Sequence, residues 1–383
     1  MKKFLALILA LVMSLSLVAC GGSKEEAKPA EQPAEQPAEE QGADFSVAMI
    51  TDYGDITDQS FNQTTYEACK AYCEANGVDF NYYKPAGDST AERVAMVEAA
   101  VDDGYTVVVM PGYAFGETIT QVADEYSDIT FIALDVGEGD LGDYTLPSNV
   151  YCAVYQEELC GYMAGYAAVK LGYTHLGFLG GMAVPAVVRY GYGFVQGADA
   201  AATETGADVT MEYVYGNQFW GDADITAYMD NWYQTLGVEV VFACGGGIYS
   251  SAAEAAAKVD AKVIGVDVDQ AGIIDGGYGE GMTVTSAMKG LAPTVEHMLT
   301  EVAAGNFSNY GGKIETLGLV SGDDPEANYV QIPMESTQWS DSFTQDDYKA
   351  LVKDMFDGKI TVSNDISAMP STSITVNEYG NIK

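Results

Sequence analysis

The chain has 383 residues, of which 17 are lysine or arginine and 56 are aspartate or glutamate, giving a formal net charge of −39 at pH 7. This charge repels nucleic acid and other polyanions, and no basic stripe in the sequence offsets the repulsion. The acidity predicts a well-solvated surface and does not identify a ligand. The part of the chain after residue 44 is too long for one hydrophobic core, so we expect two lobes.

The first 20 residues have the pattern of a secretory signal peptide. Two lysines precede an apolar run at residues 4–13, which is too short to span a membrane as a stable helix. The sequence Leu-Val-Ala-Cys at residues 17–20 resembles the bacterial lipobox, in which cleavage leaves a cysteine that accepts diacylglycerol. We therefore predict a lipoprotein signal peptide at residues 1–20 with lipidation at Cys20. An ordinary signal peptide cut near Ala19 is the alternative.

Residues 21–44 form a low-complexity segment. The sequence Pro-Ala-Glu-Gln occurs at Pro29 and again at Pro33, and Pro-Ala-Glu-Glu follows at Pro37. Almost no apolar side chain in this segment is larger than alanine, so it cannot bury enough surface to offset its chain entropy. The composition predicts a disordered, extended linker.

From Phe45 onward, strand-like and helix-like segments alternate. In the first half, runs rich in β-branched or aromatic residues predict strands, and apolar residues at helical spacing predict helices. The expected strands are 45–50, 79–84, 106–110 and 129–134, and the helices between them are 61–76, 90–103 and 117–126. A second series has helices at 161–171, 187–205, 225–234 and 248–258 and strands at 175–179, 209–215, 238–243 and 262–266.

This alternation predicts an α/β fold with two doubly wound parallel sheets. Ligands of such sheets lie beyond the carboxyl ends of the strands, so the residues that end strands are the candidates for a site. These segments are 51–53, 111–113, 135–137, 180–182, 217–222, 244–247 and 267–270. They are dominated by acids, aromatic residues and glycines, and Cys244 is their one cysteine.

The motifs of catalysis and of metal or cofactor binding are missing or incomplete. The run Gly191–Gly197 has one residue too many for a dinucleotide fingerprint and lies in an expected helix, which favours helix packing. The run Asp267–Gly272 begins like a calcium loop but has Ala271 in place of an oxygen ligand. We therefore expect no enzyme activity, no cofactor and no metal site.

Five cysteines remain after Cys20, and an odd number argues against a disulfide framework. Cys69 and Cys73 would share one face of a helix. We interpret them as small buried apolar residues, with a metal-binding pair as the alternative.

The segment from Asp58 to Gln63 combines an aromatic ring with a carboxylate and amides. An aromatic face can stack on a planar ring, and the polar groups can bind its edge or the hydroxyls of a sugar. The alternative is that Asp58 or Ser60 only caps the following helix and that Phe61 only packs.

Five motifs, in this order, resemble the basic membrane protein family. They are Asp58–Gln63, Val188–Phe194, Gly245–Gly247, Ile264–Gln270 and Thr285–Lys289. Members of this family are lipid-anchored binding subunits of ABC importers, and the best understood of them resemble purine nucleoside receptors. The resemblance covers about residues 45–319. It implies the type I periplasmic-binding-protein fold, with two doubly wound parallel-sheet lobes joined by a three-crossing hinge.

The resemblance also implies how the chain divides and which residues bind the ligand. The first lobe would comprise residues 45–153 with 286–312, the second 154–285 with 313–340, and residues 341–383 would form a C-terminal helix and tail. The residues that would bind the ligand are Asp52, Tyr53, Phe61, Asn62, Asp135, Trp220, Gly246, Gly247, Asp267 and Lys289.

The resemblance implies different roles for these ten residues. Phe61 would stack on a purine and Asp52 would bind the edge of the base, beside Tyr53, where the family often has an amide. Asp135 would be a further polar contact, and Trp220 is our candidate for a second aromatic wall. Gly246 and Gly247 would form the turn beneath the ligand, and Asp267 and Lys289 would hold the ribose hydroxyls. Lys289 pairing with an acid across the hinge is the alternative.

The implied function is that of an extracytoplasmic solute-binding lipoprotein, held at the cell membrane by its lipid. It would capture a purine nucleoside such as inosine, guanosine or adenosine and deliver it to the permease and ATPase subunits of an ABC importer. A protein that binds a sugar or another small ligand is the first alternative, because the same fold serves sugars. A surface adhesion or sensor lipoprotein is the second.

Overall fold

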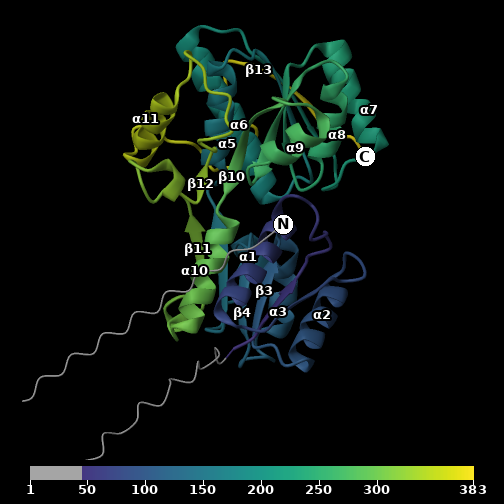
Figure 1. Ribbon diagram of the computed structural model, residues 1–383, viewed down its shortest axis with the longest axis vertical. Coiled ribbons are helices and arrows are strands. Elements are labelled where there is room, and N and C mark those ends of the chain that lie inside the picture. Colours follow the sequence, from purple (N-terminus) through teal and green to yellow (C-terminus); the bar gives the residue numbers. More distant parts are fainter. Residues whose placement is uncertain (1–44) are drawn as a thin grey trace, which may run out of the picture. The chain divides into compact units, whose positions relative to one another are not determined.

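The computed structural model describes residues 45–383. The expected signal peptide at residues 1–20, the lipidation of Cys20 and the linker at residues 21–44 lie outside the described residues. Residues 45–383 belong to one compact unit and fold into two lobes (Figure 1). Within this part of the chain, no helix is both long and apolar enough to cross a membrane.

The first lobe is built on a six-stranded sheet in the order β11-β5-β4-β3-β1-β2, in which all neighbours are parallel. Its strands are β1 (Val47–Ile50), β2 (Phe80–Tyr83), β3 (Val107–Pro111), β4 (Thr130–Leu134), β5 (Val150–Tyr155) and β11 (Lys313–Leu317). Its helices are α1 (Phe61–Asn76), α2 (Thr90–Asp102), α3 (Gly116–Val122), α4 (Glu138–Leu141) and α10 (Leu291–Ala303), with 3-10 turns at Tyr113–Phe115 and Phe307–Asn309. Strands β1 and β3 are buried along their whole length, as expected where helices cover both faces of a parallel sheet.

The second lobe is built on a seven-stranded sheet in the order β12-β10-β9-β8-β6-β7-β13, parallel except for β12. Its strands are β6 (His175–Gly180), β7 (Thr210–Tyr215), β8 (Val240–Cys244), β9 (Lys262–Asp267), β10 (Thr283–Lys289), β12 (Val330–Gln331) and β13 (Thr375–Asn381). Its helices are α5 (Glu157–Lys170), α6 (Pro185–Thr205), α7 (Ala223–Asn231), α8 (Tyr249–Ala257), α9 (Ala271–Tyr278) and α11 (Gln345–Phe356), with a π-helical turn at Trp232–Leu236 and a 3-10 turn at Pro325–Ala327.

The chain crosses between the lobes three times, after β5, after β10 and after β11. The positions of these crossings differ from the lobe boundaries expected from the sequence. Residues 286–289 belong to β10 and hence to the second lobe, whereas residues 313–317 pair with β5 in the first lobe. Residues 154–155 likewise complete β5. A strand pairs along its whole length, so each change of lobe falls just beyond a strand end. Residues 341–383 are not a separate part, because β13 pairs with β7 at the edge of the second sheet.

Helices α5 and α6 pack closely through glycines. A Cβ atom at Gly161 would lie 2.3 Å from the carbonyl oxygen of Tyr190, and one at Gly197 would lie 2.0 Å from that of Tyr162. The glycines of the near-miss dinucleotide motif therefore serve helix packing, as the sequence predicted. This packing also fixes the first half of α6, which faces the gap between the lobes.

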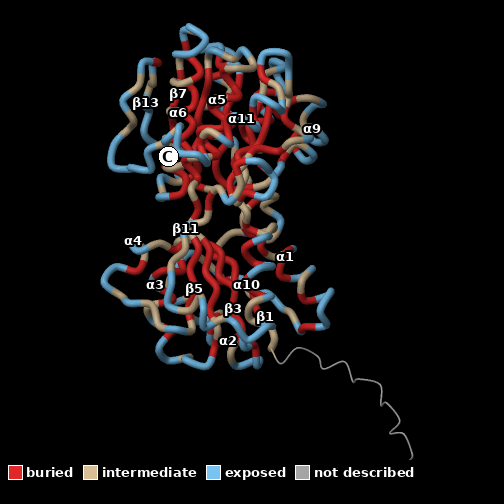
Figure 2. Tube along the Cα trace, turned by 90° about the vertical axis from the view of Figure 1, so that its left-hand side faces the viewer, coloured by how far each residue is buried: buried red, intermediate tan, exposed pale blue. Residues whose placement is uncertain are grey.

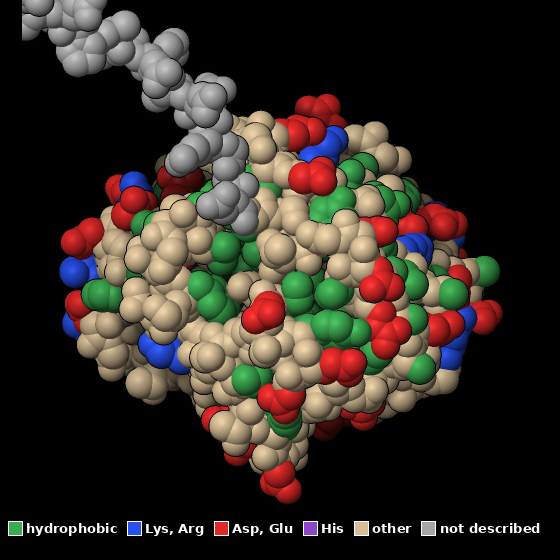
Figure 3. Space-filling view, turned by 90° about the horizontal axis from the view of Figure 1, so that it is seen from below, with side chains coloured by type: hydrophobic (Ala, Val, Ile, Leu, Met, Phe, Trp, Pro, Cys, Tyr) green, Lys and Arg blue, Asp and Glu red, His purple; other side chains and the backbone are tan. Residues whose placement is uncertain are grey.

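Buried residues fill the interior of each lobe, and exposed residues cover the outside (Figure 2). The five cysteines of the described residues are free and buried, and the burial of Cys69 and Cys73 agrees with their interpretation as small apolar residues. Figure 3 shows one face of the molecule, on which carboxylates are spread with few lysines and arginines among them. That distribution agrees with the solvated acidic surface predicted from the composition.

Candidate functional site

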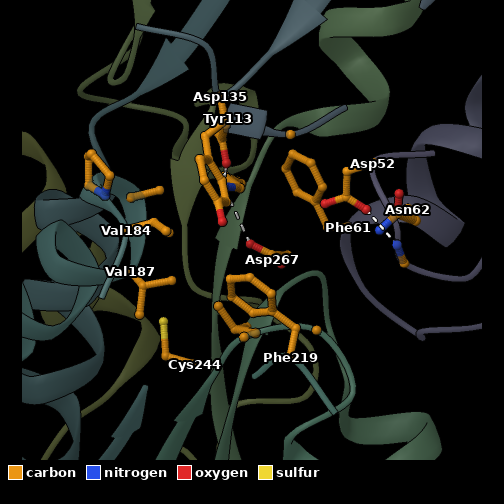
Figure 4. A pocket seen from close by; sticks show the side chains of 18 of the residues that line it. Asp52, Phe61, Asn62, Tyr113, Asp135, Val184, Val187, Phe219, Cys244 and Asp267 are labelled. Carbon is orange, nitrogen blue, oxygen red and sulfur yellow. Dashed lines mark hydrogen bonds and ion pairs between the residues drawn. The ribbon is translucent and has the colours of Figure 1, made fainter. Parts of the chain in front are cut away.

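A cavity of about 870 Å³ lies where the carboxyl ends of both sheets meet (Figure 4). Its volume is within the range of about 300–1,000 Å³ that is usual for small-molecule sites. Residues from both lobes line it, and all ten residues implied by the family resemblance are among them, from Asp52 to Lys289. The structure thus brings together side chains that lie up to 237 positions apart (289 − 52). Their individual roles stay predictions.

Asp52 follows β1 and is held by the backbone of its own loop. Its Oδ1 atom accepts hydrogen bonds from the N–H groups of Tyr53 at 2.6 Å and Gly54 at 2.7 Å. Burial raises the pKa of Asp52, and these two hydrogen bonds oppose that rise. Gly112 has a φ of 127°, and a Cβ atom there would lie 3.0 Å from Oδ2 of Asp52. A side chain at position 112 would displace the carboxylate.

Asp58, and not Ser60, caps the N-terminus of α1 with its side chain. The carboxylate of Asp58 accepts from the backbone N–H groups of Ser60, Asn62 and Gln63 at 2.9, 2.9 and 3.0 Å. Asp58 is therefore the cap, and Ser60 makes no side-chain capping bond. The hydroxyl of Ser60 instead donates to Oδ2 of Asp267 in the other lobe, at 2.6 Å.

Five charged residues meet on one side of the cavity, and we call them the charge cluster: Asp135, Glu157, Arg189, Asp267 and Lys289. The Lys289 Nζ atom lies 2.5 Å from Asp135, 3.5 Å from Glu157 and 3.7 Å from Asp267. Arg189 Nε lies 2.6 Å from Glu157. Asp135 belongs to the first lobe, so Lys289 does pair with an acid of the opposite lobe. The side chain of Lys289 is only 3% exposed.

The charge cluster combines three carboxylates with two cations in a buried setting. Burial raises the pKa of Asp135 to about 6, although the neighbouring Lys289 opposes the rise. Burial alone would lower the pKa of Lys289, but Asp135, Asp267 and Glu157 together raise it above its usual value. Lys289 is therefore charged throughout the physiological pH range.

Two acids of the charge cluster, Asp135 and Asp267, have an uncommon backbone conformation. Asp135 directly follows β4 and Asp267 ends β9, and their φ values of 61° and 66° lie in the left-handed region that non-glycine residues seldom adopt. Oδ1 of Asp135 is buried without a hydrogen-bond partner among the described residues, as is Oδ1 of Asn62. Both atoms belong to cavity-lining residues and have acceptor capacity that no hydrogen bond within the described residues uses.

Aromatic rings line the cavity from both lobes. The ammonium of Lys289 lies 4.7 Å from the ring centre of Phe61, within the range of a cation–π contact. Trp220 also lines the cavity, and 54% of its surface is exposed. The half-buried Phe219 beside it was missed by the sequence analysis.

Glycines make room for Phe219. A Cβ atom at Gly181 would lie 2.4 Å from its ring, and one at Gly246 would lie 2.8 Å from its carbonyl oxygen. That oxygen accepts from the N–H of Gly247 at 2.8 Å. The turn at Gly246 and Gly247 therefore positions an aromatic residue that lines the cavity. The glycines at the ends of β6 and β8 are the sequence feature that could have indicated a bulky side chain packed between these strand ends.

Tyr53 and Tyr113 of the first lobe both approach Met182 of the second. The hydroxyl of Tyr53 donates to the Met182 sulfur at 3.4 Å, and that of Tyr113 lies 4.0 Å from it. Burial raises the pKa of both phenols, which therefore remain protonated donors at neutral pH. Tyr113 stands at a strand end that the sequence analysis noted, but no motif singled it out.

The lobes are joined across the cavity by side-chain contacts as well as by the crossings. Besides the bonds of Ser60 and Lys289, the amide of Gln270 donates to the backbone oxygen of Gln59 at 3.0 Å. Gln59 has a positive φ of 57°, so the loop that precedes α1 is held in an uncommon conformation toward the second lobe. The arrangement suits enclosure of a small ligand between two lobes.

Comparison with known proteins agrees with this geometry. The model of a protein family described as ABC transporter substrate-binding protein, PnrA-like, matches residues 45–353. A CD4+ T-cell-stimulating antigen of Listeria monocytogenes is 29% identical over 82% of this chain and 87% of its own length. The ABC transporter nucleoside-binding protein BmpA of Lactococcus lactis is 25% identical over 83% of this chain and 89% of its own.

A solved structure gives the same picture of the fold. An ABC transporter solute-binding protein from Conexibacter woesei has a TM-score of 0.64 and 24% identity over 84% of this chain and 99% of its own. Together with the two parallel sheets, this likeness confirms the predicted α/β architecture of type I periplasmic-binding proteins.

Proposed function

The chain belongs to the family of PnrA-like ABC transporter substrate-binding proteins, and from that premise we propose that it captures a purine nucleoside in the cavity between its lobes. The observation that carries the proposal is the meeting of an aromatic ring, Phe61, with the buried charge cluster in one cavity. A nucleoside needs both chemistries, because it joins a flat ring to a sugar rich in hydroxyls. The name of the nucleoside-binding relative BmpA agrees with this ligand class.

The ring of the base would lie against Phe61 and would find its polar edge beside Asp52, Asn62 and Tyr53. Aromatic stacking on a base contributes about 1–3 kcal/mol and tolerates any base. The carboxylate of Asp52 and the free Oδ1 of Asn62 are acceptors, which suits a base edge that carries N–H groups.

The sugar would bind at the charge cluster. The hydroxyls of ribose donate to carboxylates and accept from ammonium groups, and Asp135, Asp267 and Lys289 offer both. A phosphate is disfavoured there, because three carboxylates already face the two cations. The proposed ligand is therefore a nucleoside and not a nucleotide.

Proteins of this family are extracytoplasmic and serve the membrane components of an ABC transporter. We propose that this chain is held at the cell membrane by a lipid on Cys20 and delivers its ligand to a permease with ATPase subunits. Cys20→Ser would remove the modification that supplies the acyl chains, so the variant should leave the membrane fraction. Retention of the variant after a salt wash would contradict lipid tethering.

A thermal-shift panel tests the ligand class. Inosine, guanosine or adenosine should raise the melting temperature, because a ligand that binds the folded state stabilises it by mass action. The corresponding monophosphates should raise it far less, and free ribose hardly at all, since ribose lacks the stacking face. A panel in which ribose or a nucleotide stabilises more than every nucleoside would overturn the proposal.

A further inference from the structure

The C-terminal part of the chain lies beyond the family match, which ends at residue 353. Helix α11 ends at Phe356, and the chain then runs without regular structure until β13 begins at Thr375. Strand β13 pairs with β7, and Lys383 forms an ion pair with Asp222 of the second lobe. This part is therefore bound to the second lobe at its far end.

Both ends of residues 363–373, which we call the C-terminal loop, are fastened to helix α6. The side-chain amide of Gln196 donates to the backbone oxygen of Ser363 at 3.0 Å and accepts from its N–H at 2.9 Å. Oδ1 of Asp199 accepts from the N–H and hydroxyl of Ser373 at 2.7 and 2.6 Å, and from the N–H of Ile374 at 3.1 Å. Apart from the bond of the Ser373 hydroxyl, these bonds satisfy backbone groups that lie outside the strands and helices.

The two anchor residues are three positions apart on α6 and so lie on one face of the helix. The C-terminal loop consequently leaves and returns at nearly the same place, which is the geometry of an Ω-loop. Within it, the carboxylate of Asp365 accepts from the N–H of Ser367 at 2.9 Å, and the hydroxyl of Ser363 accepts from the N–H of Asp365 at 3.3 Å. The backbone on both sides of Ile366 is thereby held in a fixed turn.

Ile366 itself lines the cavity, and it is the contribution of the C-terminal loop to the site. Ile366 is 37% exposed, so part of its apolar surface is available for contact with a ligand. The same helix that anchors the loop supplies Pro185 and Val187 to the cavity from its first turn. Val187 and the preceding Val184 are labelled beside the cavity in Figure 4. Ile366, Pro185 and Val187 are thus apolar members of a lining that also contains residues of the charge cluster.

We propose that the C-terminal loop is a lip of the binding cavity, in which Ile366 covers the bound nucleoside and slows its release. The proposal rests on the proposed function for the identity of the ligand. A partly exposed apolar side chain in a cavity lining can exclude water from the polar contacts beside it, and it loses its own exposure when a ligand binds. Because the loop is fastened to α6, it moves with the second lobe.

The test compares Ile366→Ala with Ile273→Ala. Ile273 is a matched control, since it is 39% exposed on α9 of the same lobe and does not line the cavity. Release of inosine is followed by stopped-flow tryptophan fluorescence, with Trp220 of the cavity as a reporter. Ile366→Ala should raise the release rate about tenfold, the scale of a lost apolar contact in a pocket, with little change in the association rate. Ile273→Ala should leave both rates unchanged.

A second variant loosens the loop without altering the cavity lining. Asp199→Ala removes three hydrogen bonds at the loop's end, and it should speed release by a smaller factor while the melting temperature without ligand stays close to that of the parent. Equal release rates for the parent and Ile366→Ala would overturn the proposal that the C-terminal loop slows ligand release. A parent that binds ribose and no nucleoside would overturn the proposed function, and the release rates are then compared with ribose. A parent that binds neither would overturn both.

Discussion

The two walls of the cavity are held together by different kinds of interaction. On the first-lobe wall, Asp52 and Asp58 are stabilised by backbone N–H groups within a few residues of themselves. On the second-lobe wall, Lys289 and Arg189 are stabilised by carboxylates that come from other elements, including Asp135 across the cleft. The first wall is thus assembled locally, and the second is assembled by the tertiary fold.

Because of this difference, we expect substitutions in the two walls to affect ligand affinity and the free energy of unfolding to different extents. A side chain of the first wall, such as Phe61, can be removed without leaving a buried charge unpaired, so its loss should weaken ligand binding more than folding. A member of the charge cluster cannot be removed in this way, because its partners stay buried and charged. The variants below test whether the two walls divide along this line.

Lys289→Ala should have the largest effect. It removes the cation that faces Asp135, Glu157 and Asp267, and breaking a buried ion pair costs about 3–5 kcal/mol of the free energy of unfolding. Urea denaturation measures the loss. The control is Lys258→Ala, which breaks a half-exposed ion pair with Asp230 and should cost less than about 1 kcal/mol. Similar losses for both variants would show that the charge cluster is not interdependent.

The pH dependence of stability isolates Asp135. Its pKa in the folded protein is raised to about 6, above the ordinary value near 3.8, so the folded state binds the proton more tightly than the unfolded state. The stability gained from that proton is fully present below about pH 4 and is lost as the pH rises through 6. Relative to Asp135→Asn, the parent should therefore gain about 2–3 kcal/mol when the pH falls from 7 to 4.

Denaturant titrations at several pH values measure this difference between the two proteins. Burial also raises the pKa of Glu158, to about 7, but Glu158 is present in both and its effect cancels. Parallel stability profiles for the parent and Asp135→Asn would contradict the raised pKa of Asp135.

Phe61→Ala tests the first wall. Loss of a stacking ring should weaken nucleoside binding by about 1–3 kcal/mol, with a smaller change in the free energy of unfolding. Calorimetric titration gives the affinity. Phe356→Ala is the control, because Phe356 is an exposed phenylalanine at the end of α11 that does not line the cavity. Equal affinities for the parent and Phe61→Ala would remove Phe61 from the site.

The sequence predicted which positions of the site stand at strand ends. Strand-end positions drew attention to Asp52, Asp135 and Asp267, since apolar runs and β-branched residues mark the strands before them. The fold class followed from the alternation of strands and helices. Strand β5 was missed although its residues 150–155 are apolar, and with it the strand-end position of Glu157.

What the sequence did not identify was the partner of each charged residue in the charge cluster. Arg189 lies 32 positions from Glu157, and Lys289 lies 154 positions from Asp135, so no local pattern relates them. The cap of α1 shows the same limit on a smaller scale. Asp58 and Ser60 are equally good capping residues by type, and the choice between them depends on Asp267 in the other lobe, which accepts the Ser60 hydroxyl.

Ser60→Ala tests this link between the walls and should have the smallest effect. The variant loses one hydrogen bond to a carboxylate across the cleft and no capping bond, so closure of the lobes should become less favourable by about 1 kcal/mol. A ligand that binds the closed form then binds several-fold more weakly. Ser89→Ala is the control, because Ser89 does cap α2 through the N–H of Glu92 and does not line the cavity.

The two serine variants should therefore differ in which quantity they lower, the free energy of unfolding or the nucleoside affinity. Ser89→Ala should lower the free energy of unfolding by about 1 kcal/mol and leave nucleoside affinity unchanged. Ser60→Ala should lower affinity in calorimetric titration and change the free energy of unfolding less. If Ser60→Ala instead reduced stability with unchanged affinity, its hydroxyl would serve the folding of the two lobes and not their closure on a ligand. The contrast between a locally assembled wall and a tertiary one would then not extend to the contacts that join them.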